Sequence, residues 1–442
     1  MTSVPAYEYS VREQRGWYSY DWANSGFATT TIALFLGPYL TALAKTAADA
    51  AGYVYPLGIT VDARSYWSYL VSLSVILQVL VLPVVGAIAD YGRRKKECLA
   101  VTAYVGAVAA ASMFTLDGGE YMLGGVLFLI ANVSFGASIV VSNSFLPEIA
   151  PPEQRDAVSS NGWGIGYLGG GVLLGLNLLL YLNASRLGIS EALAVRISLG
   201  LAGVWWGVFT IPALLTLRNR GREQAPAFTR RVFAGVFLQL GQTIKGIRRY
   251  PQTTLFLVAF LLYNDAIQAV LALASQFGND ELKIPISTLT MVILMVQFVA
   301  FAGALGFNWL AARTDTKRAI AASLLLWIAA LLYLYAAVHT TAEFFAVSAV
   351  VAIVMGGSQA LSRSLFARMI PKGREAEYFG IYEVSDKGTS WLSPLIFGLA
   401  LQWTGSYRWA ILSLIVFFVG GLAVLARVDV AEGEREALRS GR

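Results

Sequence analysis

The residues of this sequence that could do chemistry are ionisable side chains inside long apolar runs. Asp265 lies in the middle of the run 253–277, with Asn264 and Gln268 beside it. A charged residue at the centre of a bilayer costs roughly 2.5–3.5 kcal/mol on insertion scales, so it needs a partner or a function. Because burial favours the uncharged form of a carboxyl group, Asp265 is a candidate proton carrier. A structural hydrogen bond to another helix is the alternative interpretation.

Asp21 and Asn24 are spaced three residues apart in the run 20–44, which places them on one face of a helix. Arg363 lies near the end of the run 343–366. An arginine at such a site can clamp a carboxylate, so a substrate role for Arg363 stays open.

A third set of charged residues lies early in the run 379–402 and consists of Glu383, Asp386 and Lys387. Glu383 or Asp386 is within plausible reach of Arg363. This set, together with Arg363, favours a cytoplasmic gate over a substrate site.

Cys98 is the only cysteine and His339 the only histidine. These counts exclude an intramolecular disulfide and a thiolate metal cluster, and they argue against Ser–His catalysis or a His-based metal site. The loops contain no HExxH, GxSxG or P-loop motif. We therefore expect no enzyme activity, no cofactor and no metal.

The elements that must hold these side chains are transmembrane helices. Of the 442 residues, 57% are hydrophobic and 14% are charged, against about 25% charged in soluble proteins. A helix needs about 20 apolar residues to cross the hydrocarbon core. Twelve such runs lie at residues 20–44, 65–89, 97–116, 121–146, 157–182, 193–217, 253–277, 287–311, 319–338, 343–366, 379–402 and 409–427. The fold class predicted is an all-α membrane protein with twelve transmembrane helices.

The basic residues predict the orientation. The N-terminal segment, the loops after even-numbered runs and the C-terminal tail hold 25 Lys and Arg, whereas the opposite loops hold 5. The positive-inside rule then places both termini in the cytoplasm. The net charge of +6 follows from these loops, so no nucleic-acid partner is expected.

The chain divides into two halves. Residues 218–252 are the longest polar stretch and hold eight basic residues against one acidic residue. We predict a six-helix bundle over residues 1–217, a basic cytoplasmic linker over 218–252, and a second six-helix bundle with a short tail over 253–442. An offset of 220 residues supports the repeat, because it pairs the Gly, Ser and Pro positions of residues 136–151 with those of 356–371.

The loop after the second run reads GAIADYGRRKK over residues 86–96. It resembles the loop signature of the major facilitator superfamily, in which a glycine, an aspartate and a basic cluster follow one another. The resemblance implies that Asp90 faces the N-terminal end of helix 11, where the helix dipole favours negative charge. It also implies that Arg93 and Arg94 help to close the cytoplasmic side. This copy is one residue shorter than usual before Gly92, which leaves the partners of Arg93 and Arg94 open.

A narrower resemblance rests on five strings in a fixed order. They are YDWANS at 20–25, FLPEIA at 145–150, GYLGGG at 166–171, YND at 263–265 and GGSQALSRS at 356–364. Together they resemble the family of autophagy-related vacuolar amino-acid effluxers and their bacterial relatives. That family implies a transporter, with amino-acid efflux for its fungal members and no settled substrate for its bacterial ones.

The superfamily fold lines a central cavity with helices 1, 4, 7 and 10. On that resemblance, nine polar residues are expected to converge on the substrate and proton pathway: Asp21, Asn24, Asn132, Asn143, Asn264, Asp265, Gln268, Gln359 and Arg363. The resemblance also packs helix 5 against helix 8. Small residues on both helices then predict a sliding surface between the halves: Gly162, Gly166, Gly170, Gly303 and Gly306.

The sequence thus predicts a proton-coupled carrier that exports a small polar solute, an amino acid or similar metabolite, by alternating access. An importer or drug exporter of the same fold is the alternative, and a membrane-embedded lipid-handling protein is the alternative of another class. The expected partners are the lipid bilayer, the solute and H⁺. We expect a monomer in a bacterial inner membrane.

Overall fold

The computed structural model describes residues 9–63, 66–91, 93–220, 250–387, 392–404 and 406–439. Eleven helices in these ranges are long and apolar enough to cross a membrane, and each corresponds to one predicted run. They are Val11–Ala47, Tyr69–Asp90, Lys95–Thr115, Tyr121–Ile149, Pro152–Leu182, Glu191–Thr216, Pro251–Leu271, Met291–Arg313, Thr316–Ala337, Thr341–Arg368 and Tyr407–Ala426.

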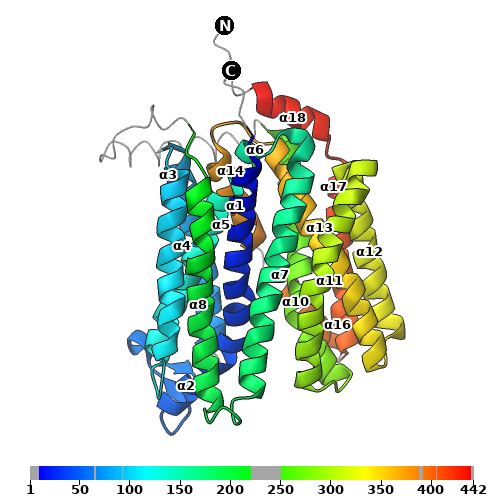
Figure 1. Cartoon of the computed structure of the whole chain (residues 1–442). Helices are drawn as coiled ribbons and strands as arrows, with labels where there is room; N and C mark the ends of the chain where they lie inside the picture. The colour runs from blue at the N-terminus through cyan, green and yellow to red at the C-terminus, as the bar shows by residue number, and fades with distance from the viewer. Residues whose placement is uncertain are drawn as a thin grey trace.

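The helices of the first half are coloured blue to green in Figure 1, and those of the second half yellow-green to red. The first half contains α1 (Val11–Phe27), η1 (Ala28–Phe35), α2 (Leu36–Ala47), α3 (Tyr66–Tyr91), α4 (Lys95–Ser112), α5 (Tyr121–Asn143), α6 (Leu146–Ile149), α7 (Arg155–Leu182) and α8 (Glu191–Thr216). The second half contains α10 (Pro251–Gln276), η7 (Phe277–Glu281), α11 (Ile286–Arg313), α12 (Thr316–Ala337), α13 (Thr341–Arg368), α14 (Glu375–Lys387), α15 (Leu392–Thr404), α16 (Tyr407–Ser413), α17 (Ile415–Ala426) and α18 (Val430–Arg439).

The predicted span at 379–402 is covered by two helices, α14 and α15, with residues 388–391 outside the described part of the chain. Most of the predicted linker, residues 221–249, also lies outside it. One short antiparallel hairpin is present, in which β1 (Tyr53–Val54) pairs with β2 (Val61–Asp62) between α2 and α3.

Helix 1 is one continuous helical segment, Val11–Ala47, with a π-helical section (η1) in the middle. The section begins beside three consecutive threonines, whose hydroxyl groups can compete for backbone hydrogen bonds. Thr29 Oγ1 donates to the carbonyl of Ser25 at 2.9 Å and approaches that of Gly170 in α7 at 3.3 Å. Asn177 Nδ2 of α7 donates to Thr30 Oγ1 at 3.0 Å. Helix 1 is therefore tied to α7 by two consecutive residues at the start of the wider turn.

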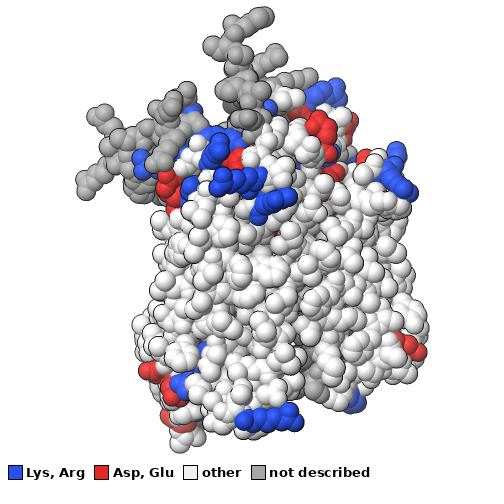
Figure 2. Space-filling model, viewed as in Figure 1, with Lys and Arg blue, Asp and Glu red and all other residues white. Residues whose placement is uncertain are grey.

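The halves meet along four helix pairs. Helix α7 packs against α11 and α13, and α14 packs against α3 and α5. The first turn of α1 and the helix α18 lie at the same end of the molecule, called the termini face below (Figure 1). In Figure 2 the middle of the surface carries no charge, and Lys and Arg gather at the termini face. An uncharged belt between two polar ends is the surface that a bilayer requires.

The predicted glycines pack differently from the expectation. A Cβ added at Gly162, Gly166 or Gly170 would meet α1, at atoms of Asp21, Ser25 and Thr29. These three glycines therefore bring α7 close to α1 within one half. The glycines of α7 that face α11 are Gly164, against Phe301, and Gly171, against Gln297.

On α11 the partner also differs. A Cβ at Gly303 would lie 2.3 Å from the carbonyl oxygen of Ile353 in α13, whereas nothing lies within 4 Å of one at Gly306. The regular spacing of the glycines identified helix faces made of small residues. It did not identify which helices these faces contact, because such a face fits any neighbouring helix that approaches closely.

Candidate functional site

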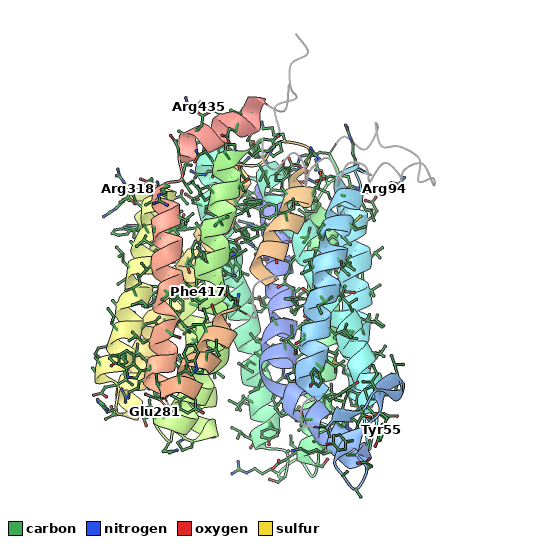
Figure 3. All side chains as sticks on the ribbon, turned by 180° about the vertical axis from the view of Figure 1, so that it is seen from behind. Tyr55, Arg94, Glu281, Arg318, Phe417 and Arg435 are labelled. Atoms are coloured by element: carbon green, nitrogen blue, oxygen red, sulfur yellow. The ribbon has the colours of Figure 1, made fainter. Side chains whose placement is uncertain are left out.

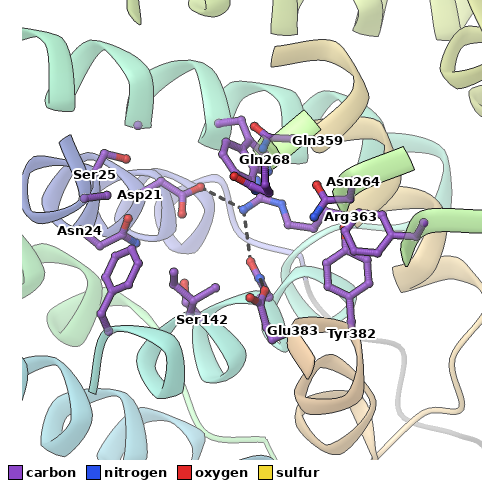
Figure 4. A pocket seen from close by; sticks show the side chains of 17 residues that line it. Asp21, Asn24, Ser25, Ser142, Asn264, Gln268, Gln359, Arg363, Tyr382 and Glu383 are labelled. Atoms are coloured by element: carbon purple, nitrogen blue, oxygen red, sulfur yellow. Dashed lines mark hydrogen bonds and ion pairs between the residues drawn. The ribbon is translucent and has the colours of Figure 1, made fainter. Parts of the chain in front are cut away.

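A cavity of about 290 Å³ lies between the halves near the middle of the molecule. Polar side chains from five helices point into it (Figure 4). Its wall contains Asp21, Asn24 and Ser25 of α1, Ser142 and Asn143 of α5, Asn264 and Gln268 of α10, Gln359 and Arg363 of α13, and Tyr382 and Glu383 of α14. Phe135, Ile139, Trp163 and Phe260 add apolar surface.

An ion pair between the halves crosses this cavity. Arg363 Nη1 lies 3.3 Å from Asp21 Oδ2 and 3.2 Å from Asn143 Oδ1. The Arg363 side chain is 4% exposed and that of Asp21 is 12% exposed. The pair exists because α7 carries no side chain at Gly162, where a Cβ would lie 2.4 Å from Asp21 Oδ2.

The rest of the guanidinium is held by α7 and by two indole rings. Arg363 Nε donates to Ser159 Oγ at 2.8 Å and Nη2 to the Ser159 carbonyl at 2.7 Å. The guanidinium carbon lies 4.6 Å from the ring centre of Trp17 and 5.4 Å from that of Trp163. Stacking on aromatic faces and a fixed set of donors hold this cation in one orientation.

Glu383 is the second carboxylate in the cavity wall. Its Oε1 accepts a hydrogen bond from Asn143 Nδ2 at 3.1 Å, so Asn143 links Glu383 to Arg363. Glu383 and Arg363 thus line the same cavity, with Asn143 between them, and the carboxylate paired with the Arg363 guanidinium is that of Asp21. The side chains of Asp386 and Lys387 lie outside the described part of the chain.

Seven of the nine predicted pathway residues line the cavity, and two lie elsewhere. Asn132 donates to Ser74 Oγ of α3 at 2.8 Å. Asp265 Oδ2 accepts hydrogen bonds from the backbone N–H of Ser393 at 3.0 Å and from Ser393 Oγ at 2.7 Å. Ser393 is in the first turn of α15, so Asp265 is placed as a cap of that helix. This corresponds to the structural alternative for Asp265.

Asp90 belongs to a buried charge cluster at the termini face. Lys95 Nζ lies 3.2 Å from Asp90 Oδ1, 2.7 Å from Glu148 Oε1 and 3.0 Å from Glu375 Oε2. Asp90 Oδ2 accepts the backbone N–H of Glu377 in the first turn of α14 at 2.8 Å. Asp90 is thus at the N-terminal end of helix 11, where the superfamily resemblance implies it. We call these four residues, Asp90, Lys95, Glu148 and Glu375, the Asp90 cluster.

The shortened loop after Asp90 is closed by its backbone. The N–H of Arg93 donates to the carbonyl of Asp90 at 3.1 Å, and that of Arg94 to the carbonyl of Ala89 at 3.2 Å. Arg93 is exposed and has a left-handed φ of 48°. The basic residue at the centre of the cluster is Lys95.

A second charge cluster joins the halves beside α7. Asp156 in the first turn of α7 accepts hydrogen bonds from Ser364 Oγ, from Thr316 Oγ1 at 2.6 Å and from Arg368 Nη2 at 3.0 Å. Ser364 and Arg368 are at the end of α13, and Thr316 begins α12. We call these residues, Asp156, Thr316, Ser364 and Arg368, the Asp156 cluster.

Sequence reasoning missed Lys95, Glu148, Glu375 and Asp156. A weak signal existed, because Glu148 lies within a string that carries the family resemblance and Asp156 opens a predicted helix.

Most of the polar contacts between the halves gather toward the termini face. Besides the two clusters, Arg155 donates to the Ala367 carbonyl at 2.9 Å, and Ser159 donates to the Ala360 carbonyl at 2.7 Å. Tyr167 donates to Gln359 at 2.6 Å, about three turns into α7. The structure is therefore one in which the halves are closed together at the termini face.

Comparison with known proteins now identifies the family. The family model described as "Vacuole effluxer Atg22 like" matches residues 9–438. The chain belongs to this Atg22-like family. An uncharacterised MFS-type transporter of Bacillus subtilis, YxiO, is 29% identical over 95% of each chain. Autophagy-related protein 22-1 of Penicillium rubens is 27% identical over 98% of this chain and 92% of its own.

Solved structures share the fold of this Atg22-like protein. The proton:xylose symporter XylE has a TM-score of 0.70 at 12% identity, and covers 97% of each chain. A bacterial homologue of the iron transporter ferroportin, in an outward-facing state, has a TM-score of 0.65 at 15% identity over 95% of this chain and 99% of its own. The predicted major facilitator fold and family are confirmed. This Atg22-like protein is a multi-pass membrane transporter of the major facilitator type.

Proposed function

We propose that this Atg22-like protein is a proton-coupled exporter of a small zwitterionic solute, such as an amino acid, which binds in the central cavity. The observation that carries the proposal is the Asp21–Arg363 ion pair, because it lies in the cavity wall and spans the two halves. The solute offers one group for each member of the pair. The carboxylate of the solute replaces Asp21 as the partner of the Arg363 guanidinium, and the ammonium of the solute pairs with the carboxylate of Asp21.

The cavity wall supports a solute of this size and kind. A volume of about 290 Å³ is at the lower end of ligand sites and suits a single small molecule. Phe135, Trp163 and Phe260 offer apolar surface for the side chain of an amino acid. Asn24, Asn264 and Gln268 offer amide groups for its polar part.

Replacement of the ion pair by the solute couples binding to movement. Asp21 is in the first half and Arg363 in the second, so their contact helps to hold the halves together at the termini face. A solute that satisfies both charges removes the need for that contact. The Asp90 and Asp156 clusters then remain as the contacts that must open for release on this side.

The charges of the cavity support proton coupling. Its described wall holds two carboxylates, Asp21 and Glu383, and one guanidinium, Arg363. A zwitterion brings no net charge, so one negative charge remains, and a proton neutralises it. Glu383 replaces Asp265 as the proposed proton carrier, because Asp265 accepts two hydrogen bonds from Ser393 away from the cavity.

The family and the charge bias support the proposed direction and location. The family is described as vacuole effluxer like, which supports export. The 25-to-5 distribution of basic residues supports cytoplasmic termini, so the termini face is the cytoplasmic face. The bacterial relative supports an inner-membrane location, and we propose that the protein acts as a monomer.

The test is solute uptake in proteoliposomes, with a panel of acidic, neutral and basic amino acids and an imposed pH gradient. Arg363→Gln should reduce uptake at least tenfold, because about 1.4 kcal/mol of lost binding gives that factor. Arg363→Lys should recover only part of it, since a lysine lacks the fork that holds a carboxylate. Arg196→Lys is the matched control, because Arg196 pairs with Asp117, whose side chain is 72% exposed.

Glu383→Gln should abolish the dependence of uptake on the pH gradient, whereas Asp265→Asn should retain it. Full uptake by Arg363→Gln would overturn the proposed site. Uptake driven only by the opposite gradient would favour an importer. Binding of large apolar drugs with no amino-acid uptake would favour a drug exporter.

A further inference from the structure

The hairpin between α2 and α3 presents an apolar tip at the face opposite the termini. Its exposed side chains are Tyr53, Tyr55, Leu57 and Ile59, with relative exposures of 40%, 49%, 88% and 64%. Leu57 adopts a left-handed conformation, with φ of 52° and ψ of 28°. A leucine in this conformation is strained, and an exposed one gains nothing from its own fold in return.

The hairpin holds this tip rigidly. Asp49 Oδ1 accepts the backbone N–H groups of Ala51 at 3.0 Å and of Tyr53 at 2.9 Å, and Asp49 Oδ2 accepts the hydroxyl of Tyr55. Val54 and Ala63 are buried at 1% and 2% exposure and anchor the base of the hairpin. The exposed tip is therefore a fixed shape and not the loose end of a loop.

The hairpin lies at the edge of the bundle, as the labelled Tyr55 shows in Figure 3. It is followed directly by α3, which turns exposed apolar side chains outward along its length: Tyr69, Leu73, Ile76 and Leu80. In a membrane transporter this face contacts lipid. The apolar tip thus lies at the start of the exposed apolar face of α3.

We propose that the tip around Leu57 inserts into the membrane leaflet opposite the termini face, with the lipid head-group region as its partner. Tyrosine and aliphatic side chains suit this boundary, where one end of a residue is wet and the other apolar. Residues 48–63 contain no Lys or Arg and two Asp. The insertion is thus driven by apolar contact and does not need anionic lipid.

Site-directed spin labelling tests the proposal, and the single cysteine makes it practical. In the full-length protein with Cys98→Ala, one nitroxide is attached at Leu57→Cys, or at Ile59→Cys as a second probe. Thr60→Cys is the matched control, because it is exposed on the same hairpin and adjacent side chains of an extended strand point to opposite sides. Ile76→Cys is the lipid reference, because Ile76 is exposed on α3.

In phosphatidylcholine vesicles, labels at residues 57 and 59 should be more accessible to oxygen than to a water-soluble nickel chelate. Their depth should be about 5–10 Å below the surface, as for other interfacial segments. The depth should not change when anionic phosphatidylglycerol is added. Accessibility to the nickel chelate equal to that at residue 60 would overturn the proposal. Protection from both reagents would overturn it in favour of a second copy or another protein.

Discussion

The Asp90 cluster and the Asp156 cluster join the same halves at the same end of the molecule, but they distribute charge differently. In the Asp90 cluster, the base is the first residue of α4, and the acids come from the end of α3, from α6 and from the start of α14. In the Asp156 cluster, the acid comes from helix 5, and the base comes from the end of helix 10. The first residue of α12, Thr316, contributes a hydroxyl.

The offset of 220 residues shows that the two halves carry opposite charges at corresponding positions. It pairs Glu148 with Arg368, and Arg155 with Glu375, so an acid in one half corresponds to a base in the other. Packing of the halves requires opposite charges across the contact and does not require a given sign on a given helix. The internal repeat therefore preserves where charged residues lie and not which charge they carry.

Burial also differs between the clusters. The four side chains of the Asp90 cluster are at most 8% exposed, and three carboxylates contact the Lys95 ammonium, while Arg220 Nη1 lies 3.4 Å from Glu148 Oε2 at the edge of the cluster. In the Asp156 cluster, Asp156 and Arg368 are 13% and 20% exposed, and the pair is balanced. The buried cluster should depend far more on Lys95, the base that all three acids contact, than on any one of its acids.

The largest effect is expected from Lys95→Met. Loss of the ammonium leaves three buried carboxylates together, which should destabilise the closed state by roughly 3–5 kcal/mol. Distances between spin labels at Glu153→Cys and Lys372→Cys, in the Cys98→Ala background, measure opening at the termini face. Arg318→Gln is the control, because its pair with Asp315 is 79% and 47% exposed, and it should leave the distances unchanged. A closed Lys95→Met would show that this cluster does not hold the halves.

Asp156→Asn should have the next effect, about 1.5–3 kcal/mol, through the loss of charge on the hydrogen bonds to Arg368 and two hydroxyls. The same pair of labels reports it. If Asp156→Asn opens the protein more than Lys95→Met does, the more exposed cluster is the stronger one and the comparison is reversed.

Asp90→Asn should have a smaller effect, about 1 kcal/mol. Two carboxylates remain on Lys95, and the new amide oxygen can still accept the N–H of Glu377. The residue that the superfamily signature marks should thus matter less than Asp156, which the signature does not mark. A populated open state of Asp90→Asn larger than that of Asp156→Asn contradicts this ranking.

Thr316→Val should have the smallest effect, about 0.5–1 kcal/mol, because it removes one neutral donor to Asp156 and keeps the ion pair with Arg368. Thermal unfolding of the variant in detergent, compared with Thr314→Val, measures it. Thr314 is the control because its hydroxyl bonds to the carbonyl of Leu310 in α11, the helix that ends just before it. Equal melting temperatures for the two variants would show that Thr316 adds nothing to the cluster.

Much of this structure could be predicted, because lipid imposes strong constraints on sequence. Most apolar runs located their helices to within a few residues, although helix 1 begins at Val11 and not near residue 20, and the run 379–402 is divided between α14 and α15. The spacing of Asp21 and Asn24 predicted a shared face of helix 1, and both residues line the cavity. The superfamily resemblance placed Asn264, Gln359 and Arg363 in the cavity wall.

The error at Asp265 has a physical reason. Asn264 and Asp265 are adjacent, so their side chains point about 100° apart on the helix. Helix α10 is apolar on most of its surface. The hydrophobic pattern of its sequence therefore does not show which side of the helix faces the cavity. The wall contains Asn264, whereas Asp265 points to α15. Likewise, nothing local to Lys95 reveals that Glu148 and Glu375 approach it, because those contacts depend on how three distant segments assemble.

The continuous helix Val11–Ala47 has a mechanical consequence. Asp21 lies before its π-helical section, and the hairpin begins just after its C-terminal end. The residues that follow Asp21, up to Ala47, make about 39 Å of helix, more than the thickness of the hydrocarbon. A movement of helix 1 at the ion pair therefore reaches the hairpin, on the opposite side of the membrane, through the wider turn of η1.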